Sequence, residues 1–173
     1  MMMLSVIGVT LGATVIGMRS DSGVEVALAV LLDRKGESIG HATFTQIPQG
    51  IRIRVLIFDL PPGMHAMHIH AVGECQASDF MSHGEHFNPF GKKHGARNRD
   101  GPHAGDLPNF EVRVDGTAEV EVTSHLLTLG HGRNSLLPSG KTCLVIHEFP
   151  DDEVTDPTGN AGIRIACGPI VKQ

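Results

Sequence analysis

From residue 24 onward the sequence alternates between short apolar segments and turn-forming residues. In the segment IRIRVLI (51–57), aliphatic residues occupy every second position, and two of the positions between them carry arginine. Successive side chains of a strand point to opposite faces of a sheet, so this alternation predicts a half-buried antiparallel strand. Tyrosine and tryptophan are absent from the chain, so we expect an aliphatic core.

The same pattern predicts eight strands, at about residues 24–33, 38–47, 51–60, 64–71, 110–114, 117–123, 142–148 and 163–170. Asp115 and Gly116 separate two of them and form a strong signal for a two-residue hairpin turn. No long helical period and no internal repeat is present. We therefore predict an all-β fold, an eight-stranded antiparallel Greek-key barrel or sandwich of immunoglobulin-like architecture with long metal-binding loops.

The N-terminus carries an apolar run at residues 4–17, which has the length of a signal peptide and is too short to span a bilayer comfortably. No lysine or arginine precedes it. A buried strand is the alternative, but the methionine-rich start and the polar segment that follows favour export. We predict an export segment at 1–20 and one domain at 24–173, located in the periplasm or outside the cell. Membrane association is expected only if the first segment is retained.

The charge of the chain excludes some classes of partner. The formal net charge is −5 and the isoelectric point is near 6.1, which argue against binding to nucleic acid or to an anionic membrane. The sequence leaves the oligomeric state open, a homodimer included.

Residues 65–106 gather histidines in a pattern that packing alone does not explain. His68 and His70 stand two apart in a predicted strand, so both rings leave the same face and can share one metal ion. Four further groups follow in a polar stretch rich in glycine and proline: His86, His94, His103 and Asp106. A loop can wrap them around a second ion. Three imidazoles and a carboxylate suit tetrahedral Zn²⁺, and an imidazole-rich set suits copper.

The pattern therefore predicts two adjacent metal sites. Four other histidines are expected to be ordinary surface or hydrogen-bonded residues, namely His41, His83, His125 and His131.

These residues resemble the metal-binding core of the copper/zinc superoxide dismutases. The resemblance is carried by five motifs in the family's order: GMHAMHIH (63–70), HFNPFGKKHG (86–95), GPHAGDLPN (101–109), LVIHEFPDD (144–152) and TGNAGIRIACG (158–168). It extends from about residue 24 to the C-terminus.

The resemblance implies two metal ions with one shared ligand. Copper would be held by His68, His70, His86 and His147, and zinc by His86, His94, His103 and Asp106. The imidazolate of His86 would bind one metal through each ring nitrogen.

The resemblance also assigns roles to residues around the metals. Asp151 would tie a copper histidine to a zinc histidine, here His68 and His94, and His65 would hold backbone without binding metal. Arg164 would stand beside the open copper face, and Thr158 would narrow the channel.

A disulfide between Cys75 and Cys167 is likewise implied by the resemblance, with Cys143 left as a free thiol. A disulfide suits an oxidising compartment, in agreement with export.

The activity implied by the resemblance is antioxidant dismutation of superoxide to oxygen and hydrogen peroxide, with copper cycling between Cu(II) and Cu(I) and a structural zinc. Arg164 would dock the anion through its charged fork, and His86 would carry a proton. Residues 71–85 and 148–163 contain no lysine or arginine, so we expect weak long-range steering of superoxide. The alternatives are a non-catalytic copper/zinc-binding protein of the same fold and a metal-stabilised structural or adhesion sandwich.

Overall fold

The computed structural model describes residues 23–76, 80, 84–137 and 142–173, so the predicted export segment lies outside the described residues. All regular secondary structure in these residues is β-strand. The strands are β1 (Val26–Asp33), β2 (Ser38–Ile47), β3 (Gly50–Ile57), β4 (Gly63–His65), β5 (Met67–His70), β6 (Phe110–Val112), β7 (Ala118–Ser124), β8 (Cys143–His147), β9 (Arg164–Pro169) and β10 (Val171–Lys172).

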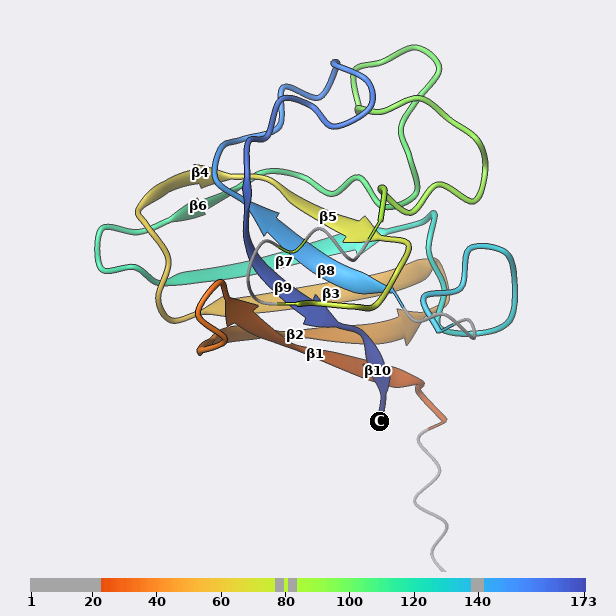
Figure 1. The fold of residues 1–173 in the computed structure, drawn as a ribbon. Coiled ribbons are helices and arrows are strands. Elements are labelled where there is room, and N and C mark those ends of the chain that lie inside the picture. The colour runs from red at the N-terminus through yellow and green to blue at the C-terminus, as the bar shows by residue number, and fades with distance from the viewer. Residues whose placement is uncertain (1–22, 77–79, 81–83, 138–141) are drawn as a thin grey trace, which may run out of the picture.

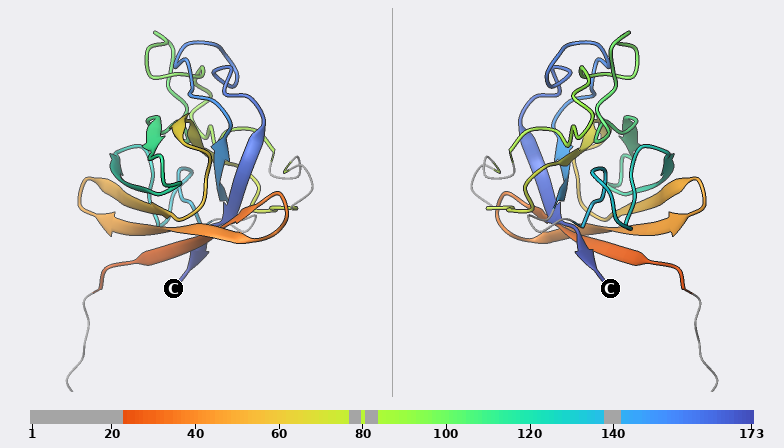
Figure 2. Two further views of the ribbon diagram at one scale, coloured as in Figure 1. Left: turned by 90° about the vertical axis from the view of Figure 1, so that its left-hand side faces the viewer. Right: turned by 90° about the vertical axis from the view of Figure 1, so that its right-hand side faces the viewer.

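The strands form one curled antiparallel sheet and a small separate pair. The strand order of the large sheet is β5-β8-β9-β1-β2-β3-β7, with β10 on β1, and β4 pairs with β6 (Figure 1). The side views show the sheet curving around the core (Figure 2). The predicted all-β, antiparallel fold class is therefore confirmed.

One predicted strand, at residues 64–71, is divided in the structure. The N–H of Ala66 donates to the carbonyl of Phe149, and the N–H of His147 donates to the carbonyl of Ala66, each at 3.0 Å. The chain changes partner at this point, from β6 to β8. A cross-sheet hydrogen-bond pattern of this kind leaves no trace in the alternation of side chains.

The alternation in β3 is present as predicted. Its aliphatic side chains are almost completely buried, whereas Arg52 and Arg54 point outward and pair with Glu121 and Glu119 of β7. The core between the curved faces consists mainly of aliphatic side chains, with Phe44 among the largest that are fully buried.

Two long loops connect strands of the sheet: residues 71–109, here called the metal loop, of which 77–79 and 81–83 are not described, and residues 148–163, here called the C-terminal loop. The later, green part of the metal loop lies beside the blue C-terminal loop (Figures 1 and 2). Their backbones approach closely at Gly95, whose φ is +101°. A Cβ atom at this position would lie 2.2 Å from the carbonyl oxygen of Glu153, so the contact between the loops requires glycine.

The metal loop also covers the open edge of β5. The N–H of Ile69 donates to the carbonyl of Gly105 (2.9 Å), and the N–H of Phe87 donates to the carbonyl of Ile69 (2.8 Å). Unpaired strand edges expose backbone groups that need partners. By supplying them, the loop is held in register beside the strand that carries His68 and His70.

Cys75 and Cys167 form a disulfide, as predicted, with their Cα atoms 5.7 Å apart. The bridge joins the metal loop to β9 across a sequence separation of 92 residues. In the chain-entropy model a loop of that length contributes about 4.6 kcal/mol of stability. Nothing helical in the described part of the chain has the length and apolarity that a membrane span requires.

Replacing Phe44 by alanine is expected to lower the free energy of unfolding of the metal-free protein by about 3–5 kcal/mol, because the ring is fully buried and its removal leaves a cavity. The matched control is Phe58→Ala, whose side chain is 56% exposed and whose loss should change stability by no more than about 0.5 kcal/mol. Equal losses in a denaturant titration would contradict this placement of the core.

Candidate metal centre

The strands β5 and β8 place three histidines on the same outer face of the sheet. Met67 and Ile69 of β5 enter the main core, so the alternating residues His68 and His70 face the other way. On β8, which pairs with β5, Leu144 and Ile146 also enter the core. The next residue, His147, therefore joins the two histidines of β5.

The metal loop brings further ligands to that face by pairing with β5. Isolated bridges connect His68 with Asp106 and His70 with His86. Gly105 is required here, because a Cβ atom would lie 2.4 Å from the carbonyl oxygen of Ile69. His86 and Asp106 are 20 residues apart in sequence, yet the edge of one strand holds both.

The first group of ligands is buried and has ring nitrogens without partners. The available ligand atoms lie within 4.8 Å of one another in the set His68, His70, His86 and His147. Three buried nitrogens have no hydrogen-bond partner among the described residues: Nδ1 of His68, Nε2 of His86 and Nε2 of His147. Buried polar atoms almost always have a partner, so a metal ion fits this cluster.

The second group converges on one carboxylate oxygen. Nδ1 of His86, His94 and His103 lies 3.0, 3.1 and 3.2 Å from Oδ1 of Asp106. Four ligands placed about 2.0–2.1 Å from one tetrahedral ion stand roughly 3.3 Å apart. The observed separations therefore fit a zinc ion.

Backbone groups fix the orientation of Asp106. Its second oxygen, Oδ2, accepts hydrogen bonds from the N–H groups of Gly95 and His103, both at 2.9 Å. This arrangement turns Oδ1 toward the three imidazoles.

Asp151 connects the two ligand groups. Its Oδ2 lies 2.8 Å from Nε2 of His68, and its Oδ1 lies 3.0 Å from Nε2 of His94. Each contact occupies the ring nitrogen that faces away from the metal-ligand cluster and so fixes the ring orientation. Gly159 allows this approach, because a Cβ atom there would lie 1.9 Å from Oδ1 of Asp151.

Asn109 is a positioning residue that the sequence reading missed. Its side-chain amide donates to the carbonyl of Asp151 and accepts from the N–H of Asp151, both at 2.8 Å. Asn109 closes the motif GPHAGDLPN, but nothing in the spacing of that motif indicates a partner 42 residues away.

The remaining predicted residues lie around the cluster. His65 contacts only backbone oxygens through its ring nitrogens, with 2.8 Å to His147 and 2.8 Å to Pro61. Arg164 is paired with His147 across β8 and β9 and is half-buried. Thr158 is half-buried and precedes Gly159 in the C-terminal loop.

Two further carbonyl groups orient histidines of the first ligand group. Nδ1 of His70 lies 2.9 Å from the carbonyl oxygen of Gly84, and Nδ1 of His147 lies 3.2 Å from that of Gly162. His41, His125 and His131 belong to no candidate metal cluster among the described residues, and His83 lies outside them.

Burial keeps two of the histidines neutral. It lowers the pKa of His86 to about 4 and that of His147 to about 3, and the neighbouring His68 contributes to both shifts. Arg164 lowers the pKa of His147 further. A neutral imidazole can bind metal without first losing a proton.

His94 differs from these two. Burial opposes its charge, but the hydrogen bonds to Asp106 and Asp151 prevail and raise the pKa of His94 to about 9. The same contacts hold the pKa values of both carboxyl groups well below their usual range. In the metal-free protein a proton on His94 compensates part of the negative charge.

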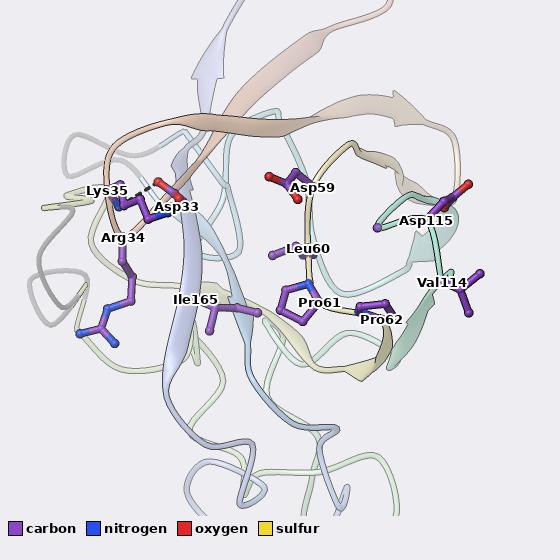
Figure 3. A pocket seen from close by; sticks show the side chains of 11 residues that line it. Asp33, Arg34, Lys35, Asp59, Leu60, Pro61, Pro62, Val114, Asp115 and Ile165 are labelled. Atoms are coloured by element: carbon purple, nitrogen blue, oxygen red, sulfur yellow. Dashed lines mark hydrogen bonds between the residues drawn. The ribbon is translucent and has the colours of Figure 1, made fainter.

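A cavity of about 580 Å³ lies elsewhere, between the β1–β2 turn, the segment after β3 and the β6–β7 turn (Figure 3). None of the predicted site residues lines it. Two of its three carboxylates stabilise the turns: Asp33 accepts from the N–H groups of Lys35 and Glu37, and Asp115 accepts from the N–H of Thr117.

Zinc binding at pH 7 is expected to release about one proton, because His94 has a raised pKa and must lose its proton to become a ligand. The release should decline toward zero as the pH rises through about 9. Calorimetric titration in buffers of different protonation enthalpy measures it. His131→Ala, which removes an exposed histidine that belongs to no candidate metal cluster of the described residues, should leave the value unchanged. Zinc uptake without proton release at pH 7 would contradict the charge state assigned to His94.

Comparison with known proteins agrees with this geometry. A family model described as copper/zinc superoxide dismutase (SODC) matches residues 38–170. The chain is 48% identical over 144 residues to superoxide dismutase [Cu-Zn] 1 of Aquifex aeolicus, an alignment that covers 82% of this chain and 85% of the relative. It is 46% identical over 165 residues to superoxide dismutase [Cu-Zn] 2 of the same organism, covering 94% of this chain and 96% of the relative. A solved SOD-like protein from Bacillus subtilis superposes with a TM-score of 0.80 at 35% identity, covering 83% of this chain and 97% of that one. The chain belongs to the copper/zinc superoxide dismutase family.

Proposed function

We propose that this protein binds copper and zinc and dismutates superoxide to oxygen and hydrogen peroxide. The observation that carries the proposal is the pair of buried ligand sets that share His86. One set contains buried imidazole nitrogens without hydrogen-bond partners, and the other is built around Asp106. The family membership supplies the reaction. When bound, copper supplies one-electron exchange by cycling between Cu(II) and Cu(I).

The ring nitrogens of His86 have separate environments. Nδ1 faces Asp106 and the zinc set, whereas Nε2 belongs to the copper set. Nε2 is the atom that can take up and return a proton whenever it is not engaged as a ligand. Nδ1 would remain in the zinc set, together with Asp106, while this happens.

Arg164 is the residue that we assign to docking superoxide. It stands opposite His147 in the β8–β9 pairing, and its permanent charge can attract a small anion at short range. Thr158, in the C-terminal loop, is assigned to narrowing the approach. Both assignments follow from the family motifs, and that of Arg164 is supported by its position next to His147.

Two cations of the metal loop are already paired with carboxylates. Lys93 is paired with Asp156 at 2.8 Å, and Arg97 is paired with Glu153 at 3.4 Å. Cations of the metal loop are thus offset by the acidic C-terminal loop. Arg164 is therefore expected to provide most of the attraction.

Export to the cell envelope remains a prediction. The disulfide supports it, because such bonds persist in oxidising compartments. The oligomeric state and any association with a membrane likewise remain open predictions.

The ligand assignment predicts opposite losses in two single variants. His147→Ala should lose copper and keep zinc, because His147 belongs only to the copper set, and His103→Ala should lose zinc first. Elemental analysis after loading with both metals measures the two occupancies. Equal loss of both metals from each variant would rule out two separate sites.

Replacing Arg164 by alanine should reduce the rate constant for superoxide by about tenfold or more, a docking contribution of about 1.4 kcal/mol. Arg164→Lys retains the charge but loses the planar fork, so it should recover only part of the rate. Pulse radiolysis from low to high salt measures the rate constants. The parent should depend weakly on ionic strength, because the Debye length of roughly 8 Å at physiological salt exceeds the docking distance.

The same experiment separates catalysis from storage. A protein that holds copper and zinc in full and scavenges no superoxide would be a metal-binding protein of this fold, and the proposed activity would be wrong. A steep salt dependence in the parent together with a fast Arg164→Ala variant would instead show that distant charges, and not Arg164, attract superoxide to the site.

A further inference from the structure

A cluster of three cysteines lies at the outer face of β8 and β9, and the activity proposed above makes no use of it. The sulfur atoms of Cys75, Cys143 and Cys167 all lie within 4.8 Å of one another, although only Cys75 and Cys167 are bonded. Cys143 and Cys167 are fully buried, and Phe80 covers them in a small cluster separate from the main core. A free thiol is thus enclosed beside a disulfide.

The free thiol faces the loop segment that carries its candidate partner. The Sγ–H of Cys143 donates to the carbonyl of Val72 at 3.2 Å, three residues before Cys75. We propose that Cys143 is a second covalent partner for Cys75, so that the metal loop can be bridged either to β9 or to β8.

The exchange needs no external oxidant or reductant. The Cys143 thiol loses its proton, and the resulting thiolate attacks Sγ of Cys75. The Cys75–Cys167 bond breaks as the Cys75–Cys143 bond forms. Cys167 leaves as a thiolate and takes up a proton, so the number of disulfides and thiols is unchanged.

Strand register favours Cys75, and not Cys167, as the new partner. Cys143 pairs with Pro169 and Val145 pairs with Cys167, so Cys143 and Cys167 are diagonal neighbours in the sheet. Diagonal neighbours have Cα atoms roughly 7–8 Å apart, beyond the roughly 4.4–6.8 Å of ordinary disulfides. Cys75 lies in a loop, where a small shift of the backbone can bring its sulfur to Cys143.

Burial also explains why the native bridge persists in the folded protein. Cys143 and Cys167 are fully buried and Phe80 packs against both, so a third group has little room to reach the bridge. Exchange is therefore expected to be slow while Phe80 covers the cluster.

The two bridges would hold different parts of the metal centre. The native bridge ties the loop between His70 and His86 to β9, three residues from Arg164. The alternative bridge would tie the same loop to β8, four residues before His147. The cluster thus offers two covalent anchor points for one ligand-bearing loop.

The test is peptide mapping of the purified full chain after alkylation without reduction. Cys167→Ser, equilibrated in a glutathione redox buffer, should form the Cys75–Cys143 bridge and lose the alkylation of both cysteines. The matched control is the double variant Cys167→Ser/Cys143→Ser, in which Cys75 should be fully alkylated after unfolding. Equal alkylation of Cys75 in the single and double variants would overturn the proposal.

A second measurement uses the unaltered chain and does not depend on the folding of a variant. After incubation in the same buffer at alkaline pH and acid quenching, the parent should yield a minor Cys75–Cys143 peptide that is absent from Cys143→Ser. Failure to find this peptide in the parent would also overturn the proposal. The readout is a covalent bond, so its outcome is independent of the metal content and of the superoxide assay.

Discussion

Burial of a dense polar cluster is the constraint on which the rest of the structure depends. Six imidazoles of the two ligand groups are at most 6% exposed, and four of them contact the carboxylate of Asp106 or Asp151. Each buried polar group left without a partner costs about 1–3 kcal/mol. The cluster can exist only where backbone carbonyls, carboxylates, protons or metal ions satisfy its ring nitrogens, and the two long loops provide most of these partners.

Because of this constraint, the strands and the loops hold different parts of the site. β5 and β8 fix three histidines with the rigidity of a paired sheet, and the open edge of β5 holds two segments of the metal loop in register. The C-terminal loop contributes Asp151, which joins one histidine of each ligand group, and Asn109 of the metal loop secures Asp151 in turn. The two loops therefore depend on each other, and displacement of one removes partners from the other.

The charged residues of the two loops affect both stability and function. Two cations of the metal loop, Lys93 and Arg97, are paired with acidic residues of the C-terminal loop, which stabilises the contact between the loops but offsets positive charge that could attract superoxide. Arg164 retains a position next to His147. The disulfide and the neighbouring thiol of Cys143 lie on the outer face of β8 and β9, and Cys143 pairs with His70 of β5, so the covalent anchor of the loop lies next to the first ligand group.

The sequence by itself determined the fold class, because strand alternation is a local property: the burial of Ile51, Ile53 and Val55 and the exposure of Arg52 can be read from residues two apart. It also indicated two metal groups, because the spacing of His68 and His70 is local, and the family motifs pointed to His147 and to the cysteine pair. Only the tertiary structure decided the division of 64–71 at Ala66, the covering of the β5 edge, the contact of Asn109 with Asp151 and the position of Cys143 beside the disulfide. Each of these features joins segments distant in sequence through backbone hydrogen bonds or the diagonal geometry of a sheet, and neither leaves a periodic signal in the chain.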